Sequence, residues 1–168
     1  MDKAVSNATP IIYLAKSDKL NVLKAIVRQV YIPDAVFQEV VIEGKRLGEK
    51  DAYRVEKCIQ QGWLNVQKVE NMLTFDIPLH CGELEVISLA VQKGITNVLI
   101  DDAKARSIAD LSGLQPLGTL WVILEVVKKH ILDFDDFLST LESIIDAGFY
   151  LKDEVYIRVI RKARELTK

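Results

Sequence analysis

The sequence has very few cysteines and no long hydrophobic run. Cys58 and Cys81 are its only cysteines among 168 residues, too few for a disulfide framework or a zinc site built on thiolates. We therefore expect a reduced, cytoplasmic setting. No apolar run approaches the ~20 residues that a membrane helix needs, and the broken apolar stretch at the N-terminus is not typical of a signal peptide. We expect no membrane association.

Several catalytic motifs are also missing. The chain has no Gly-rich phosphate loop of the P-loop or dinucleotide type and no Gly-x-Ser-x-Gly elbow. Nothing in it suggests an organic cofactor. His80 and Cys81 are adjacent, but with only His130 and Cys58 besides them no set of standard metal-ligand spacing appears, and we do not expect this pair to bind a metal.

Short apolar runs alternate with segments of helical periodicity along most of the chain. We expect strands over 3–6, 29–32, 63–66, 97–100 and 114–117, the one over 63–66 at a sheet edge. The expected helices begin near residues 9, 20, 34, 48, 82, 103, 120, 134 and 153. This alternation predicts an α/β fold with a mainly parallel sheet. At this length we expect a single domain over 1–168, with a sheet core over about 1–130 and a C-terminal helical extension over 131–168.

The most informative stretch runs from Gly82 to Asp102. Glu83 stands at the N-terminal tip of the expected helix. Asp101 and Asp102 directly follow the expected strand 97–100. In a β-α-β unit both positions lie at the sheet edge formed by the carboxyl ends of the strands, where open α/β sheets bind ligands.

Glu39 is a further acid on an otherwise apolar helical stripe, shortly after the expected strand 29–32. A carboxylate among apolar neighbours is costly to bury without a partner. Together with Glu83, Asp101 and Asp102 it offers the oxygen ligands that Mg²⁺ and Mn²⁺ prefer. Such a site can generate a hydroxide and stabilise a displacement at phosphorus.

Each acid also has a simpler interpretation. Asp101 and Asp102 can cap the helix that follows them, and Glu83 can be an ordinary first-turn acid. Glu85 points to the opposite helical face, and we expect it to be only a solvated charge.

The charge balance leaves nucleic-acid binding open. The formal net charge is -2, but without Glu39, Glu83, Asp101 and Asp102 the chain has 20 acids against 22 Lys and Arg. The segment after Glu43 is locally basic, and such a run is more often a solvated helix face than a binding patch. As contacts to an RNA backbone we suggest Lys45, Arg46, Lys50 and Arg54.

Taken together, these motifs resemble the PIN-domain family, metal-dependent ribonucleases that include the toxins of VapBC toxin–antitoxin pairs. The chain resembles a prokaryotic PIN-like subfamily through Ser6-Asn7-Ala8-Thr9-Pro10, Gly82-Glu83-Leu84-Glu85, Leu99-Ile100-Asp101-Asp102, Gly118-Thr119-Leu120 and the segment 147–153. The resemblance covers nearly the whole chain and implies a three-layer α/β/α fold with extra C-terminal helices.

The resemblance also implies a site. It places metal ligands at Asn7, Glu39, Glu83 and Asp101, a catalytic accessory acid at Asp102, and supporting residues at Thr9 and Thr119. Asn7 departs from the family, which has Asp at this position. An amide brings a carbonyl oxygen but no charge, so metal affinity should fall, and we expect Asn7→Asp to be the more active protein.

The leading hypothesis is an Mg²⁺- or Mn²⁺-dependent ribonuclease, a hydrolase with RNA as its partner, weakened by Asn7. The resemblance also suggests an antitoxin partner and a homodimer. A second hypothesis is a PIN-like module that no longer cleaves and binds RNA or a protein partner. A third is a receiver-type phosphoacceptor domain, but in those the acid pair follows the first strand, where this chain has Asn7.

Overall fold

The computed structural model describes residues 1–167, and in them five parallel strands form one sheet in the order β3-β2-β1-β4-β5. The strands are β1 (Lys3–Ser6), β2 (Gln29–Pro33), β3 (Leu64–Gln67), β4 (Asn97–Leu99) and β5 (Gln115–Leu117). The prediction of an α/β fold with a mainly parallel sheet is confirmed, and so is the edge position of the strand near residues 63–66. Residue 168, the last of the expected extension, lies outside the described residues.

The central strands are rich in buried apolar residues because helices cover both faces of the sheet. Val5, Val30 and Val98 are completely buried at the centre of neighbouring strands. Parallel strands buried on both sides need such continuous apolar runs. The register pairs Ala4 with Val30 and Val5 with Val98, which holds the central strands in line.

Helices fill the connections between the strands. They are α1 (Ala8–Lys16), α2 (Leu20–Ile26), α3 (Asp34–Phe37), the π-helix η1 (Gln38–Glu43), α4 (Gly44–Arg46), α5 (Lys50–Gln60), α6 (Cys81–Lys93), α7 (Ala103–Leu111), α8 (Thr119–Lys128), α9 (Phe134–Asp146) and α10 (Asp153–Leu166). Within residues 1–167, no helix is long and apolar enough to cross a bilayer.

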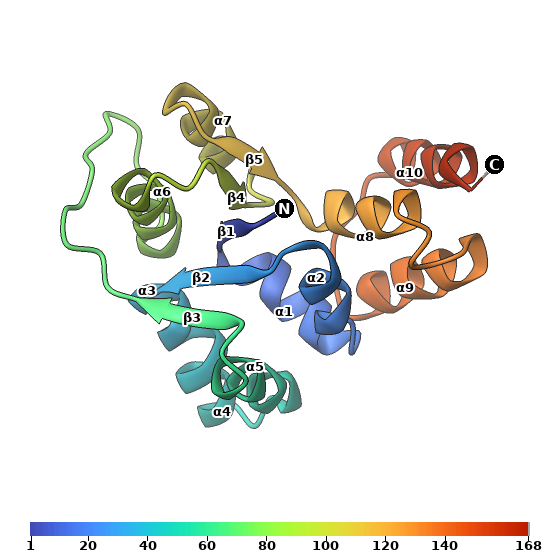
Figure 1. Cartoon of the computed structure of the whole chain (residues 1–168), viewed down its shortest axis with the longest axis horizontal. Helices are drawn as coiled ribbons and strands as arrows, with labels where there is room; N and C mark the ends of the chain where they lie inside the picture. Colours follow the sequence, from blue (N-terminus) through green and yellow to red (C-terminus); the bar gives the residue numbers. More distant parts are fainter. Residues whose placement is uncertain (168) are drawn as a thin grey trace.

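The two faces of the sheet carry different helices. α6 and α7 lie on one side of the sheet, and α1, α2 and α8 on the other (Figure 1). Connections between parallel strands are right-handed, so the face a helix covers depends on the direction in which the chain moves across the sheet. The chain moves from β1 toward β3 at first, and from β4 toward β5 later. α9 and α10 pack against α8.

The direction of winding reverses between β1 and β4, which are neighbours in the sheet. At the carboxyl end of this pair the backbone N–H of Asn7 donates to the carbonyl of Leu99 at 2.9 Å. Crevices at such switch points are where open α/β sheets bind their ligands. The fold therefore places Asn7 and Asp101 at the ends of adjacent strands.

Candidate functional site

A cavity of about 420 Å³ lies at the carboxyl edge of the sheet. We call it the acidic cleft, and its lining residues are Asn7, Ala8, Thr9, Ala35, Glu39, His80, Cys81, Gly82 and Glu83. They come from the ends of β1 and β2 and from the start of α6. The structure thus brings together Asn7, Glu39 and Glu83, three of the four residues predicted to bind metal, with Thr9 beside them.

Asn7 sits at the base of this arrangement. It follows β1 directly and is only 8% exposed. Among residues 1–167 its carboxamide has no hydrogen-bond partner, and it does not cap α1 although it occupies the N-cap position. A Cβ on Gly82 would lie 3.3 Å from Asn7 Oδ1. Because residue 82 is a glycine, the amide oxygen stays accessible from the cleft.

Glu83 has both a structural contact and a place in the cleft. It is 7% exposed, in the first turn of α6. Its Oε2 accepts a hydrogen bond from the backbone N–H of His80 at 3.0 Å. An acid near a helix N-terminus is favourable in itself, so the simpler interpretation of Glu83 accounts for this contact, while its side chain still faces the cavity.

Glu39 lies in η1, the π-helical segment that continues α3. π-helical turns insert an extra residue and are frequent at functional sites. The Glu39 side chain reaches solvent, but burial of its carboxyl group raises its pKa above the ordinary value. The nearby His80 acts in the opposite direction, and the Glu83 carboxylate adds to the rise. Glu39 and Glu83 both line the acidic cleft, so their like charges oppose the ionisation of Glu39.

Asp101 is held by a different set of contacts. The Thr119 N–H donates to Oδ1 at 2.8 Å and the Thr119 hydroxyl donates to Oδ2 at 2.6 Å. Burial raises the pKa of Asp101, while these two bonds and the Arg106 guanidinium lower it. Asp101 lines a separate cavity of about 770 Å³ together with Arg106 and Trp121, and it is not among the residues that line the acidic cleft.

Asp102 caps α7. Its side chain accepts a hydrogen bond from the backbone N–H of Ala105 at 2.8 Å, as the simpler interpretation of this residue predicts. It is exposed and follows Asp101 directly at the end of β4. The cap fixes its orientation at the carboxyl edge.

The interpretation of Glu85 as a solvated charge is wrong. Glu85 is half-buried, and its Oε2 accepts a hydrogen bond from the backbone N–H of Ala35 at 2.8 Å. The bond joins α6 to the first turn of α3, whose continuation carries Glu39. The helical spacing correctly turned Glu85 away from the sheet core, but a second helix packs against that face.

His80 and Cys81 are site residues that the sequence analysis left out. Both line the acidic cleft, and His80 lies near enough to Glu39 to affect its pKa. The search for regular ligand spacing could not detect them. The available signal was their position immediately before the Gly82-Glu83 helix start.

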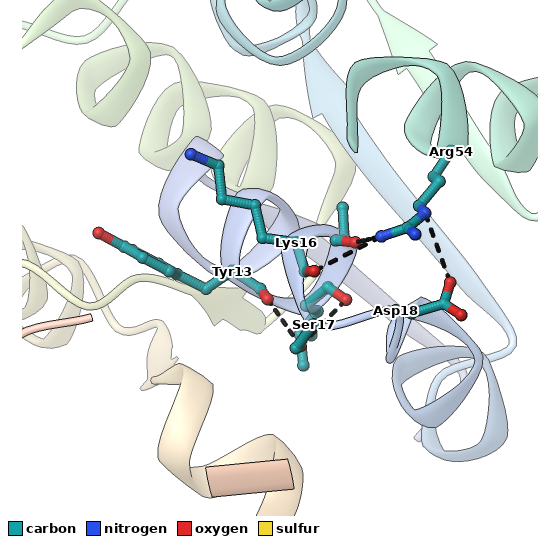
Figure 2. Close-up of polar contacts among 7 residues, drawn as sticks. Tyr13, Lys16, Ser17, Asp18 and Arg54 are labelled. Carbon is teal, nitrogen blue, oxygen red and sulfur yellow. Dashed lines mark hydrogen bonds and ion pairs between the residues drawn. The ribbon is translucent and has the colours of Figure 1, made fainter. Parts of the chain in front are cut away.

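Three of the four basic residues suggested for RNA contact have partners within the protein. Lys45 pairs with Glu56, and Arg46 pairs with Glu43. Figure 2 shows Arg54 reaching from α5 to the end of α1, where its Nη1 donates to the Ala15 carbonyl at 2.7 Å. Lys50 is exposed on the first turn of α5. Their role in RNA binding stays a prediction.

The donor set of the cleft is oxygen-rich but sparse. Within residues 1–167, no group of three His, Cys, Asp or Glu side chains is placed to hold a metal ion by itself. Two carboxylates and one amide oxygen still fit a hard cation, because Mg²⁺ usually keeps several waters and takes only one or two protein carboxylates. The repulsion between Glu39 and Glu83 is the electrostatic feature that a cation would relieve.

Comparison with known proteins identifies the family of the chain. A family model described as a PIN domain matches residues 3–165. Neither the curated proteins nor the solved structures contain a match. PIN domains have a nuclease-type fold and generally depend on divalent metal ions. Since the match spans nearly the whole sequence, the chain belongs to the PIN-domain family.

Proposed function

We propose that this PIN domain is an Mg²⁺- or Mn²⁺-dependent ribonuclease that hydrolyses RNA phosphodiesters. The observation that supports the proposal is the meeting of Asn7, Glu39 and Glu83 in one cleft at the carboxyl edge of the sheet. These residues are far apart in the sequence and come from three different connections.

Glu39 and Glu83 would hold the ion together with the Asn7 amide oxygen, directly or through water. When bound, the ion supplies Lewis-acid stabilisation of phosphate charge and a more acidic water. Glu83 is fixed by the His80 N–H, and Glu85 fixes the segment that carries Glu39. These contacts pre-organise the two carboxylates before any substrate arrives.

Asp101 and Asp102 would act from the neighbouring strand end. Thr119 holds the Asp101 carboxylate in one orientation, and the cap bond does the same for Asp102. As the family resemblance implies, we assign Asp101 to the metal site and Asp102 to water positioning, although Asp101 lines the second cavity and not the acidic cleft itself. Asn7 weakens the site, because it removes one of the charges that would attract the cation.

The test is cleavage of single-stranded RNA in Mn²⁺ by the natural chain, Asp101→Asn and Asn7→Asp. The Asn variant at 101 keeps the shape of the side chain and removes its charge. We expect metal-dependent cleavage, a loss of about tenfold or more in Asp101→Asn, and faster cleavage by Asn7→Asp. Equal rates for the natural chain and Asp101→Asn would remove the assignment.

The second candidate is a PIN-like module that binds RNA or a protein without cleaving. The uncharged Asn7 and the sparse carboxylate set favour it. Calorimetric titration with Mn²⁺ distinguishes the two proposals. Absence of metal binding at millimolar concentration, with RNA binding retained, would support the module.

We also propose that the chain works as the toxin of a toxin–antitoxin pair and forms a homodimer in the cytoplasm. These finer points rest on the sequence resemblance. A small antitoxin-like reading frame upstream of the gene would support the first. Sedimentation at micromolar concentration would decide the second, and a purely monomeric chain would contradict it.

A further inference from the structure

A cavity of about 660 Å³ lies at the amino ends of the strands, at the edge of the sheet opposite to the acidic cleft. We call it the amino-edge pocket. It is bounded by the end of α1, the start of α2, the end of α5 and the residue that precedes β3. α1 begins at the cleft and ends at this pocket, and the two cavities share no lining residue. The pocket is therefore independent of the proposed catalytic site.

The pocket is positively charged although the chain as a whole is slightly acidic. Lys24, Arg54 and Lys57 line it against a single acid, Asp18. Within residues 1–167, neither Lys24 nor Lys57 has an ion-pair partner. Burial raises the pKa of the Cys58 thiol, and the charges of both lysines act on the same thiol to lower it. Lys24, Lys57 and Cys58 all line this pocket.

Arg54 is the fixed member of this cationic set. Its Nη1 donates to the Ala15 carbonyl at 2.7 Å, and its Nε lies 3.5 Å from Oδ1 of Asp18 (Figure 2). A guanidinium has five N–H donors, so these contacts hold its plane in place without using all of them. An arginine held in this way loses little side-chain entropy when it binds an anion.

Trp63 forms part of the apolar wall of the pocket. It is 6% exposed and lines the pocket from the position just before β3. Its Nε1 is the one buried side-chain polar atom in residues 1–167 with no hydrogen-bond partner. A buried donor without an acceptor costs about 1–3 kcal/mol. Trp63 thus contributes to the wall of the pocket, while its N–H, which lacks an acceptor, is itself buried.

We propose that the amino-edge pocket binds the phosphate monoester of a nucleotide-sized ligand. Phosphate suits the set because it accepts several charge-assisted hydrogen bonds at once, from the two lysines and the guanidinium. The volume is in the range of small-molecule sites, about 300–1,000 Å³. Trp63 and Leu20, each 6% exposed, form the apolar part of the lining. The ligand is either a free nucleoside monophosphate or the 5′-phosphate end of an RNA.

The test uses Trp63 as its own reporter. The sequence has two tryptophans, Trp63 and Trp121, and Trp121 lines the other large cavity, beside Asp101. In the full-length Trp121→Phe protein with chelator present, fluorescence is titrated with AMP, inorganic phosphate and adenosine. We expect saturable binding of AMP, weaker binding of phosphate and none of adenosine.

Lysine variants in the same background test the contacts. Lys24→Ala and Lys57→Ala should each weaken AMP binding about tenfold, while the matched control Lys104→Ala, an exposed lysine on α7, should bind as before. Circular dichroism checks that each variant is folded. Competition with a 5′-phosphorylated and a 5′-hydroxyl RNA tetranucleotide separates the two sources of phosphate.

Three results would overturn the proposal: no saturable change below about 10 mM AMP, equal binding of adenosine and AMP, or unchanged affinity in both pocket-lysine variants. None of them depends on nuclease activity. The proposed ribonuclease function and the amino-edge pocket can therefore fail separately.

Discussion

Thr119 binds both oxygens of the Asp101 carboxylate, with its N–H 2.8 Å from Oδ1 and its hydroxyl 2.6 Å from Oδ2. Asp101 follows β4 and Thr119 begins α8 after β5, so the contact joins the ends of two neighbouring strands. A carboxylate that is partly buried needs such donors to remain ionised. Thr119 thereby sets the orientation of Asp101, and its two bonds lower the pKa that burial raises.

Replacing Thr119 by Val removes one of these donors and keeps the shape of a completely buried side chain. We expect the free energy of unfolding to fall by about 1–2 kcal/mol, and the pKa of Asp101 to rise further because the bond that lowers it is lost. Urea denaturation measures the first effect. Thr119→Ser keeps the hydroxyl and serves as the control. Equal stability of the Val and Ser variants would show that the bond contributes nothing.

Gly118 is the residue that makes this contact fit. A Cβ there would lie 2.7 Å from Asp101 Oδ1 and 3.0 Å from Arg106 Nη1. Because Thr119 already fixes the carboxylate, we expect Gly118→Ala to lower the free energy of unfolding by about 1–3 kcal/mol.

Gly82→Ala provides the comparison. Its Cβ would meet Asn7 Oδ1 at 3.3 Å, and alanine favours the helix in which it stands. We expect unchanged or higher stability for Gly82→Ala but weaker Mn²⁺ binding, measured by calorimetry. We therefore expect Gly118→Ala to unfold at a lower temperature than Gly82→Ala. Equal unfolding temperatures of the two variants would contradict this expectation.

Glu39 should make stability depend on pH. Its pKa is raised in the folded protein by burial, so ionisation is less favourable in the folded than in the unfolded state. The stabilising contribution is therefore complete below the ordinary value of 4.5 and is lost as the pH rises through the folded-state pKa. Without metal, Glu39→Gln should unfold at a higher temperature than the natural chain at pH 7, and at the same temperature near pH 4.

Bound metal should reverse the order of the unfolding temperatures of the natural chain and Glu39→Gln at pH 7. An ion that binds only the folded state stabilises it, so millimolar Mn²⁺ at pH 7 should raise the unfolding temperature of the natural chain more than that of Glu39→Gln. Thermal unfolding with chelator and with Mn²⁺ measures both effects. Equal responses of the two proteins to Mn²⁺ would remove Glu39 from the metal site.

Glu85 should support activity without lining the cleft. Glu85→Ala removes the acceptor of the Ala35 N–H, which should cost about 1 kcal/mol of stability and loosen the segment that carries Glu39. Glu85→Gln keeps a carbonyl oxygen and should restore most of both. Glu142→Ala, at an exposed position on α9, is the control. If Glu85→Ala cleaves RNA at the natural rate, the α6–α3 contact has no role in the site.

Local patterns were sufficient for the elements of the fold. The strand expected over 3–6 is β1, and the helices expected at 134–146 and 153–166 are α9 and α10. Side-chain periodicity and turn residues act over a few neighbours, so they can be read from the sequence. The helix expected to begin near residue 34 is broken into α3, η1 and α4, which no periodicity predicted.

The grouping of the acids could be predicted only coarsely. Glu39, Glu83 and Asp101 were all placed at the carboxyl edge, because strands of a parallel sheet end on the same side. That edge is wide enough for two cavities. Glu39 and Glu83 line one, and Asp101 lines the other.

The sequence by itself determined the order of strands and helices along the chain and the sheet edge at which the acids lie, because both follow from local spacing and from chain direction. It also showed directly that position 7 has an amide in place of a carboxylate. Only the tertiary structure decided that Glu85 binds the N–H of Ala35, fifty residues away, that His80 lies beside Glu39, and that Thr119 orients Asp101. Such contacts depend on which elements pack together, and their energies depend on how deeply the groups are buried. The spacing of residues along the sequence contains neither kind of information.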